Sequence, residues 1–153
     1  VIAGQWAAAE FGALCRLWEA GVPVPYPVQI LDTEVLLQFI GSADGSAAAP
    51  RLAQLRHDTA DLVDLWRQLV EALCIMARAG LTHGDLSAYN LLWWEDRLVL
   101  IDLPQAVEFT TNTDAFELLH RDVANVGEWF GRRGVAVDVE AVYGELVAMA
   151  WMG

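Results

Sequence analysis

The sequence predicts an α+β protein whose helices are collected toward its C-terminal end. Three observations support this class. Helical and strand-like patterns alternate up to residue 101, one polar loop separates a long amphipathic helix from a short hairpin, and helical patterns dominate after residue 113. A chain of 153 residues with 56% hydrophobic content is also long enough to bury a core of its own.

The first part of the chain, residues 1–41, is expected to form one helix and two strands. Apolar side chains recur at helical spacing over residues 5–20, and Gly21 provides a natural end for that helix. The prolines of the next segment, 22–27, keep it extended because proline cannot supply the amide hydrogen that a helix requires. The two strands are expected at 28–31 and 34–40.

A linker loop is expected at residues 42–58, where Gly, Ser and Ala are frequent. The last part, residues 59–153, is expected to be a catalytic lobe that begins with a long helix ending at residue 79, before Gly80. A polar loop and a hairpin follow, and then three helical stretches, the last at about 138–151. The loop, the hairpin strands and their turn are expected at 81–90, 91–94, 97–101 and 95–96.

The composition excludes several classes of function. The net charge is −12, whereas a nucleic-acid interface needs clustered Lys and Arg, so nucleic acid is not expected as a partner. The apolar runs are too short to cross a membrane, and none is expected to do so. Cys15 and Cys74 lack metal-binding or redox spacing, and two buried free thiols fit a reducing, cytoplasmic location.

The most informative stretch is His-Gly-Asp-Leu-Ser-Ala-Tyr-Asn at residues 83–90, followed by Ile-Asp at 101–102. Asp85 precedes the hairpin, Asn90 stands at its start, and Asp102 stands at its end. A hairpin returns the chain to the end from which it started, so these three side chains are expected to lie close together. This layout is typical of kinase-like phosphotransferases.

Each of these residue types suits one task in phosphoryl transfer. Asp85 is placed to orient an attacking hydroxyl group and to accept its proton. Asn90 and Asp102 offer an amide oxygen and a carboxylate, which are the hard ligands that Mg²⁺ prefers. Taken singly, Asp85 and Asn90 are readily explained as turn residues, whereas a carboxylate at the end of an apolar strand is costly to bury without a partner. His83 is expected to orient the loop rather than to act as the base.

The sequence resembles the RIO family of atypical protein kinases over about residues 6–130. Residues 83–90 and 101–108 carry the resemblance, including Pro104-Gln105, which stand where other kinases have the Gly of their Asp-Phe-Gly motif. Further similar segments lie at 6–14, 35–41, 49–52 and 121–126.

The resemblance implies a protein-kinase-like fold and an activity that uses ATP and Mg²⁺. Asp85 would be the catalytic Asp, and Asn90 and Asp102 would hold the metal. Two outcomes are known in this family: transfer of the γ-phosphoryl group to a protein Ser or Thr, and ATP hydrolysis through phosphorylation of the metal-site Asp, here Asp102. The protein substrate is not indicated by the sequence.

The resemblance also implies a nucleotide site. Glu10 would be the helix residue that pairs with the nucleotide-binding Lys. Gln38 and Ile40 would form the hinge that offers backbone groups to adenine, although the family usually has Glu at the position of Gln38. Leu92 and Ile101 would line the floor of the pocket, and plain core packing explains these two residues equally well.

One departure from the family pattern concerns the phosphate-binding parts. No Gly-rich loop precedes Glu10 in the sequence, and the Lys-bearing strand is missing. We therefore expect a fragment that runs from the first helix of the family pattern through the C-terminal lobe, with weak ATP binding and little turnover of its own.

Two other functions remain open on sequence grounds. Small-molecule phosphotransferases of the aminoglycoside or choline type share the His-Gly-Asp motif, but they usually have Gly soon after the metal-binding Asp. A non-catalytic kinase-like module that docks a partner is the second alternative. Retention of Asp85, Asn90 and Asp102 together argues against a chain that has lost its chemistry.

Overall fold

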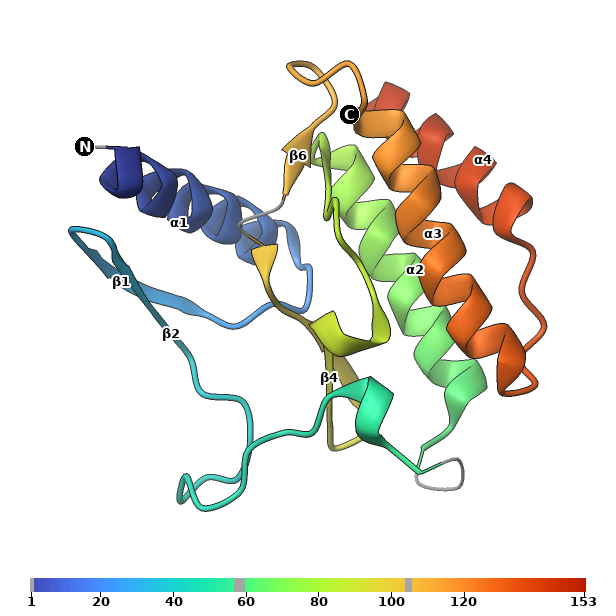
Figure 1. Ribbon diagram of the computed structural model, residues 1–153, viewed down its shortest axis with the longest axis horizontal. Coiled ribbons are helices and arrows are strands. Elements are labelled where there is room, and N and C mark those ends of the chain that lie inside the picture. Colours follow the sequence, from blue (N-terminus) through green and yellow to red (C-terminus); the bar gives the residue numbers. More distant parts are fainter. Residues whose placement is uncertain (1, 57–59, 104–105) are drawn as a thin grey trace.

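The N-terminal segment forms one helix followed by an antiparallel pair of strands. A computed structural model describes residues 2–56, 60–103 and 106–153 of the chain (Figure 1). Helix α1 spans Ile2–Ala20, strand β1 spans Pro27–Leu31 and strand β2 spans Glu34–Leu37. These elements confirm the expected helix and two strands, although β2 ends three residues before the expected limit.

The early end of β2 follows from the hydrogen bonds of Gln38. Its backbone N–H donates to Tyr26 O at 2.9 Å, and its side-chain Oε1 accepts from Tyr26 N at 3.0 Å. The Gln38 side chain thus accepts the Tyr26 N–H, which the Gln38 backbone carbonyl would accept if the β1–β2 pairing continued. The chain then turns away from β1, and a single bridge between Gly41 and Ala48 closes the following loop.

Helix α2, Leu62–Arg78, is the central helix of the second half of the chain. Asp61 caps its N-terminus by accepting a hydrogen bond from Asp64 N at 3.1 Å. Gly80, with a φ of 84°, follows its C-terminus as expected. The expected start of this helix near residue 59 lies outside the described residues, as does His57. The buried face of α2 consists of Leu65, Trp66, Leu69, Ala72, Leu73, Met76 and Ala77.

Short strands carry the loop that contains the His-Gly-Asp motif. Strand β3, Leu81–Thr82, pairs with β6, Val107–Glu108, and neither strand was predicted. Strands β4, Leu91–Trp94, and β5, Arg97–Leu100, form the expected hairpin. Two short 3₁₀ helices, η1 at Leu52–Gln54 and η2 at Ala88–Asn90, complete this region.

The prediction of three helical stretches after residue 113 was wrong. There are two, α3 at Ala115–Arg132 and α4 at Val139–Met152 (Figure 1). Gly127 interrupts the apolar pattern of α3 without interrupting the helix. A Cβ atom at this position would lie 2.9 Å from Val139 Cγ2, so the glycine permits the close approach of the segment that leads into α4.

One apolar core joins the two ends of the chain. Leu14 and Leu17 of α1 pack in the same cluster as Phe130 of α3 and Leu146 of α4. The expected boundaries at 1–41, 42–58 and 59–153 stay a prediction. Figure 1 shows α2, α3 and α4 side by side, with α1 and the β1–β2 pair on the other side of the β4–β5 hairpin.

The two cysteines are half-buried rather than buried, and they form no disulfide. Burial and the neighbouring Glu145 carboxylate raise the pKa of the Cys74 thiol to about 11, so this thiol is unreactive at neutral pH. In the described parts of the chain, we find no helix with the length and apolar character needed to span a membrane.

Candidate active site

The loop that carries the His-Gly-Asp motif is held in place by hydrogen bonds to one buried carboxylate, that of Asp122 in α3. Asp122 of α3 is fully buried and accepts hydrogen bonds from Gly84 N at 2.7 Å, Leu86 N at 3.0 Å and Thr82 Oγ1 at 3.1 Å. The Leu86 side chain is fully buried, whereas Asp85 between these anchors is exposed. The loop backbone is therefore fixed while the Asp85 side chain faces solvent.

Sequence reasoning did not assign this role to Asp122. It recognised only a resemblance of residues 121–126 to a family helix. The available signal was the position of Asp122 on the apolar face of an amphipathic helix, between Leu119 and Val123. A carboxylate on that face must find hydrogen-bond donors, because burying a bare charge is costly.

His83 links the catalytic loop to the strand that precedes Asp102. Its Nδ1 accepts from Asp85 N at 3.2 Å, and its Nε2 lies 2.8 Å from Ile101 O. A backbone N–H can only donate and a carbonyl can only accept, so these partners assign a neutral ring with the proton on Nε2. Both ring nitrogens are engaged, so neither is free to act as a base. This geometry is consistent with the predicted role of His83 in orienting the loop, which stays a prediction.

Asn90 joins the two ends of the motif. Its side-chain Nδ2 donates to Asp85 O at 2.5 Å, and its backbone carbonyl accepts from Ile101 N at 2.9 Å. The residue is 8% exposed, so the orientation of its amide is fixed. With Nδ2 engaged, Oδ1 is the atom that Asn90 can offer to a cation.

Asp102 follows β5 in an uncommon backbone conformation. Its φ is 59°, in the left-handed region that non-glycine residues rarely occupy. Its side chain is exposed, whereas Leu103 beside it is buried. Such strain in a residue at a cavity wall is often associated with function.

Glu10 of α1 and Asp102 approach each other closely enough to interact. Partial burial and the Asp102 charge raise the pKa of the Glu10 carboxyl. Neither carboxylate has an ion-pair partner among the described residues, and the sequence contains no Lys. Two carboxylates without a cation make this part of the site electronegative, which favours binding of a positive ion.

The structure brings the predicted nucleotide residues into one cavity of about 510 Å³. Its lining includes Glu10, Gln38, Ile40, Leu92 and Ile101, all five of the residues expected there, together with Asp102. Asp85 and Asn90 do not line this cavity. They connect to its wall through the Asn90 carbonyl, which accepts from Ile101 N.

The hinge segment presents two backbone groups without partners of their own. The N–H of Gln38 is bound to Tyr26 O, and the carbonyl of Ile40 accepts from Ala49 N at 2.9 Å. Among the described residues, no hydrogen bond is found for the Gln38 carbonyl or the Ile40 N–H. One acceptor and one donor at the cavity wall form the pattern that can bind the edge of an adenine ring.

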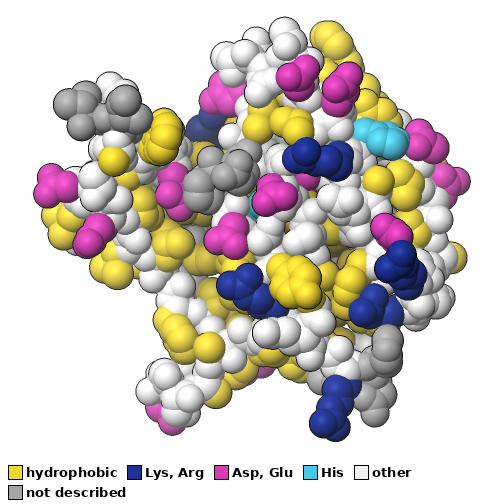
Figure 2. Space-filling view, viewed as in Figure 1, with side chains coloured by type: hydrophobic (Ala, Val, Ile, Leu, Met, Phe, Trp, Pro, Cys, Tyr) yellow, Lys and Arg dark blue, Asp and Glu magenta, His cyan; other side chains and the backbone are white. Residues whose placement is uncertain are grey.

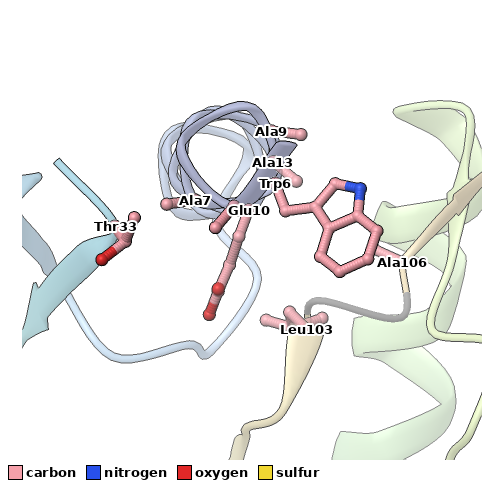
Figure 3. A pocket seen from close by; sticks show the side chains of 9 residues that line it. Trp6, Ala7, Ala9, Glu10, Ala13, Thr33, Leu103 and Ala106 are labelled. Atoms are coloured by element: carbon pink, nitrogen blue, oxygen red, sulfur yellow. The ribbon is translucent and has the colours of Figure 1, made fainter. Parts of the chain in front are cut away.

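A second cavity of about 540 Å³ lies beside α1 (Figure 3). It shares Glu10 and Leu103 with the first cavity and is otherwise lined mainly by small and apolar side chains. Figure 3 shows the Glu10 and Trp6 side chains pointing from the helix toward the level of Leu103. Glu10 thus stands between the two spaces.

A family model described as RIO domain matches residues 1–142, nearly the whole chain. The chain belongs to the RIO domain family. Membership confirms the resemblance read from residues 83–90 and 101–108, although Pro104 and Gln105 lie outside the described residues. It also disfavours a small-molecule phosphotransferase of the aminoglycoside or choline type.

Curated relatives in the RIO family are protein kinases by name. The serine/threonine-protein kinase RIO1 of Chaetomium thermophilum is 38% identical over an alignment of 138 residues that covers 85% of this chain and 26% of that protein. The RIO-type serine/threonine-protein kinase Rio1 of Haloferax volcanii is 36% identical, over 90% of this chain and 46% of its own length. The chain therefore spans less than half the length of these two relatives.

Solved structures of a RIO kinase share the fold. The crystal structure of the Rio2 kinase from Chaetomium thermophilum matches 96% of this chain and 49% of that one, with a TM-score of 0.74 and 23% identity. A second structure of the same kinase, a complex with ADP/Mg²⁺ and phosphoaspartate, has the same TM-score. The predicted α+β, protein-kinase-like fold is confirmed, whereas the roles of individual site residues stay predictions.

Proposed function

We propose that this RIO domain transfers the γ-phosphoryl group of ATP to a Ser or Thr hydroxyl of a protein, with Mg²⁺ as the metal ion. One observation carries the proposal. A single cavity gathers the hinge residues, the apolar floor and Asp102, and its wall is bonded directly to the loop that holds Asp85 and Asn90.

The donor set fits Mg²⁺. Asn90 Oδ1 and the Asp102 carboxylate are hard oxygen ligands, and Mg²⁺ is commonly held by one or two protein oxygens together with substrate phosphates. In the described residues, no group of three or more His, Cys, Asp or Glu side chains forms a metal cage of its own. When bound, the ion supplies positive charge that balances the phosphate oxygens and the carboxylates of Asp102 and Glu10.

Asp85 is the group that receives the proton in this scheme. Its backbone N–H is held by His83 and its carbonyl by Asn90, so the side chain is presented from a fixed loop. The acceptor hydroxyl oxygen bonds to the γ-phosphorus while the bond from that phosphorus to the ADP oxygen breaks. The hydroxyl proton passes to Asp85, and ADP leaves with the bonding electron pair.

A second candidate function is ATP hydrolysis through Asp102. A phosphoaspartate is present in the related Rio2 complex, and the exposed Asp102 carboxylate lies at the nucleotide cavity of this chain. In this route a carboxylate oxygen of Asp102 takes the γ-phosphoryl group and ADP leaves. Water then cleaves the acyl phosphate, which restores Asp102 and releases inorganic phosphate.

The test uses full-length protein with radiolabelled ATP, and it measures ADP release and the chemical stability of the labelled protein. We expect Asp85→Asn to lower transfer to Ser or Thr by a factor of roughly 10² to 10⁴. Asp102→Asn should abolish both transfer and hydrolysis. Label that is removed by hydroxylamine identifies an acyl phosphate, whereas phosphoserine survives that treatment.

Asp96→Asn is the matched control, because Asp96 is an exposed carboxylate at the far end of the same hairpin. Unchanged ADP release in both Asp85→Asn and Asp102→Asn would contradict the proposal. Failure of the wild-type protein to bind Mg²⁺-nucleotide would instead favour a non-catalytic module that docks a partner. Cys15 and Cys74 are half-buried and are not joined in a disulfide, from which we infer a reducing, cytoplasmic location for this activity.

A further inference from the structure

Two arginines from distant parts of the chain hold the two ends of the catalytic loop. Arg51, just before η1, donates from Nη1 to Tyr89 O at 3.0 Å. Arg121 of α3 donates from Nη2 to Gly84 O. The two carbonyls flank Asp85, so a guanidinium group stands at each end of the segment that carries the proposed base.

Both guanidinium groups keep most of their hydrogen-bonding capacity. Each has five N–H groups in a planar fork, and we find one hydrogen bond from each side chain among the described residues. Both residues are exposed. A planar fork of free N–H groups is suited to bidentate binding of a carboxylate.

Among the described residues, neither Arg51 nor Arg121 forms an ion pair with a carboxylate. In residues 2–56, 60–103 and 106–153, the ion pairs formed by arginines involve Arg16, Arg67 and Arg132, not Arg51 or Arg121. This is notable in a chain with 21 acidic and nine basic residues. Glu117 stands one helical turn before Arg121, yet it is not among the ion-pair partners.

The surface between the two arginines is accessible and partly apolar. Tyr89 is 62% exposed and Asp85 is exposed beside it. Figure 2 shows basic side chains interspersed with acidic ones on the face that carries this loop. An approaching segment therefore meets positive charge at both ends of the loop and an aromatic ring between them.

We propose that the acceptor of the phosphoryl group is a peptide segment with acidic side chains on both sides of its Ser or Thr. Arg51 and Arg121 bind those carboxylates, and the hydroxyl group is thereby placed at Asp85. This inference rests on the proposed kinase function and adds the class of substrate. Arg51 also lines the cavity proposed for the nucleotide, whereas Arg121 does not, so Arg121 is the arginine whose N–H groups are left to the peptide alone.

The test compares two Ser peptides with full-length protein, one flanked by Glu and Asp and the other by Gln and Asn at the same positions. We expect kcat/KM to be roughly five- to tenfold higher for the acidic peptide at low salt, because two exposed ion pairs form with the substrate. The preference should shrink in 0.5 M salt, since exposed charges are then screened over a few ångström.

Three substitutions separate binding of the peptide from positioning of the loop. Arg121→Gln and Arg51→Gln should each reduce the preference for the acidic peptide by about threefold. Arg121→Lys retains the charge and should retain most of the preference. Arg97→Gln is the matched control, because Arg97 is an exposed arginine at the start of β5 and contacts neither loop carbonyl.

A purely structural role for these arginines gives a different result. If they only hold the Gly84 and Tyr89 carbonyls, Arg121→Gln and Arg51→Gln lower kcat/KM for both peptides equally and leave the ratio unchanged. That outcome, or equal use of the two peptides by wild-type protein, overturns the inference and leaves the kinase function standing. Absence of transfer to either peptide and of ADP release in wild-type protein overturns both.

Discussion

The buried carboxylate of Asp122 accepts three hydrogen bonds from residues 82–86, in the loop that carries Asp85. Gly84 N and Thr82 Oγ1 share its Oδ2, while Leu86 N uses Oδ1. An Asn at this position has one acceptor oxygen and one amide nitrogen, so at least one loop N–H would face another donor. Leaving a buried N–H unsatisfied costs about 1–3 kcal/mol, and the loss of charge-assisted bonds adds to this.

We therefore expect Asp122→Asn to lower the free energy of unfolding by about 3 kcal/mol, and Thr82→Val, which removes one hydrogen bond, by about 1 kcal/mol. Urea denaturation monitored by tryptophan fluorescence measures both changes. Asp114→Asn is the control, because Asp114 is an exposed carboxylate that precedes the same helix. Equal unfolding energies for Asp122→Asn and Asp114→Asn would show that the loop does not depend on this carboxylate.

Glu10 lowers the free energy of unfolding as the pH rises, whereas a carboxylate in a salt bridge, whose pKa is lowered, raises it. Burial and the Asp102 charge raise its pKa in the folded protein. Folding thus favours the protonated form, so the contribution of Glu10 to stability is fully present below its unfolded pKa of about 4.5 and is lost as pH rises through the raised folded pKa.

Glu10→Gln should therefore stabilise the ligand-free protein at pH 7, and this gain should diminish as the pH is lowered toward 4.5. Denaturant unfolding at a series of pH values measures the difference. Glu19→Gln removes the same charge from an exposed position on the same helix and corrects for the overall negative charge. A gain that is independent of pH, or equal to that of Glu19→Gln, would rule out this linkage.

The turn between β4 and β5 holds two non-glycine residues in a strained backbone conformation, and neither residue belongs to the candidate active site. Glu95 and Asp96 have φ values of 50° and 64°, so both lie in the left-handed region. Two such residues in a two-residue hairpin loop form the type I′ geometry that Asn-Gly adopts most readily. The Asp96 carbonyl also accepts from Gln68 Nε2 at 2.8 Å, a contact that a change of side chain preserves.

Replacing Glu95-Asp96 by Asn-Gly should raise the free energy of unfolding by about 1 kcal/mol, which corresponds to about 2–4 °C in Tm for a domain of this size. Thermal unfolding of the double variant provides the measurement. Replacement of the same pair by Ala-Ala keeps the charge change but not the turn preference, and it should be destabilising. If the Ala-Ala variant were as stable as the Asn-Gly variant, the turn would not be strained.

The elements that were predicted correctly have local causes. The apolar pattern of α2 and the turn at 95–96 lie within a few residues of one another, so sequence alone indicates them. Strands β3 and β6 have two residues each, and they exist only because distant segments meet. The sequence predicted one helical stretch too many after residue 113, and the reason that α3 runs on through Gly127 is not local, since the glycine packs against Val139 of the next element.

The same distinction applies to the site. The motif spacing placed Asp85, Asn90 and Asp102 together because one hairpin connects them, and the resemblance supplied the five residues that line the cavity. Asp122 and Arg121 act on the loop from α3, more than thirty residues later. Their contributions depend on how α3 packs below the loop, and no local pattern reports that packing.

The cavity proposed to bind the nucleotide lies between the N-terminal elements and the β4–β5 hairpin region. Glu10, Gln38 and Ile40 come from α1 and the hinge, whereas Leu92 and Asp102 come from the hairpin region. The geometry of the cavity therefore depends on how α1 is held against the rest of the protein.

Arg16 of α1 connects this helix by hydrogen bonds to the C-terminus of α2 and to strand β6. Its guanidinium donates to Glu108 Oε1 at 3.0 Å and to Ala79 O, the C-cap carbonyl of α2, at 2.8 Å. A cation at a helix C-terminus is favourable because unpaired carbonyls carry partial negative charge there. Arg16→Met keeps the aliphatic stem of the side chain and removes both bonds, at a cost of about 1 kcal/mol.

We expect hydrogen exchange to report this loss unevenly. In Arg16→Met, amides of α1 and of the β1–β2 pair should exchange about fivefold faster, while the amides of α3 should change little, because local opening of α1 does not require unfolding of the helical part. Arg67→Met removes two exposed ion pairs within α2 alone and should leave the exchange of α1 unaltered. Uniform acceleration along the chain would mean that α1 opens only when the whole molecule unfolds, and the cavity would then be a rigid feature of one cooperative unit.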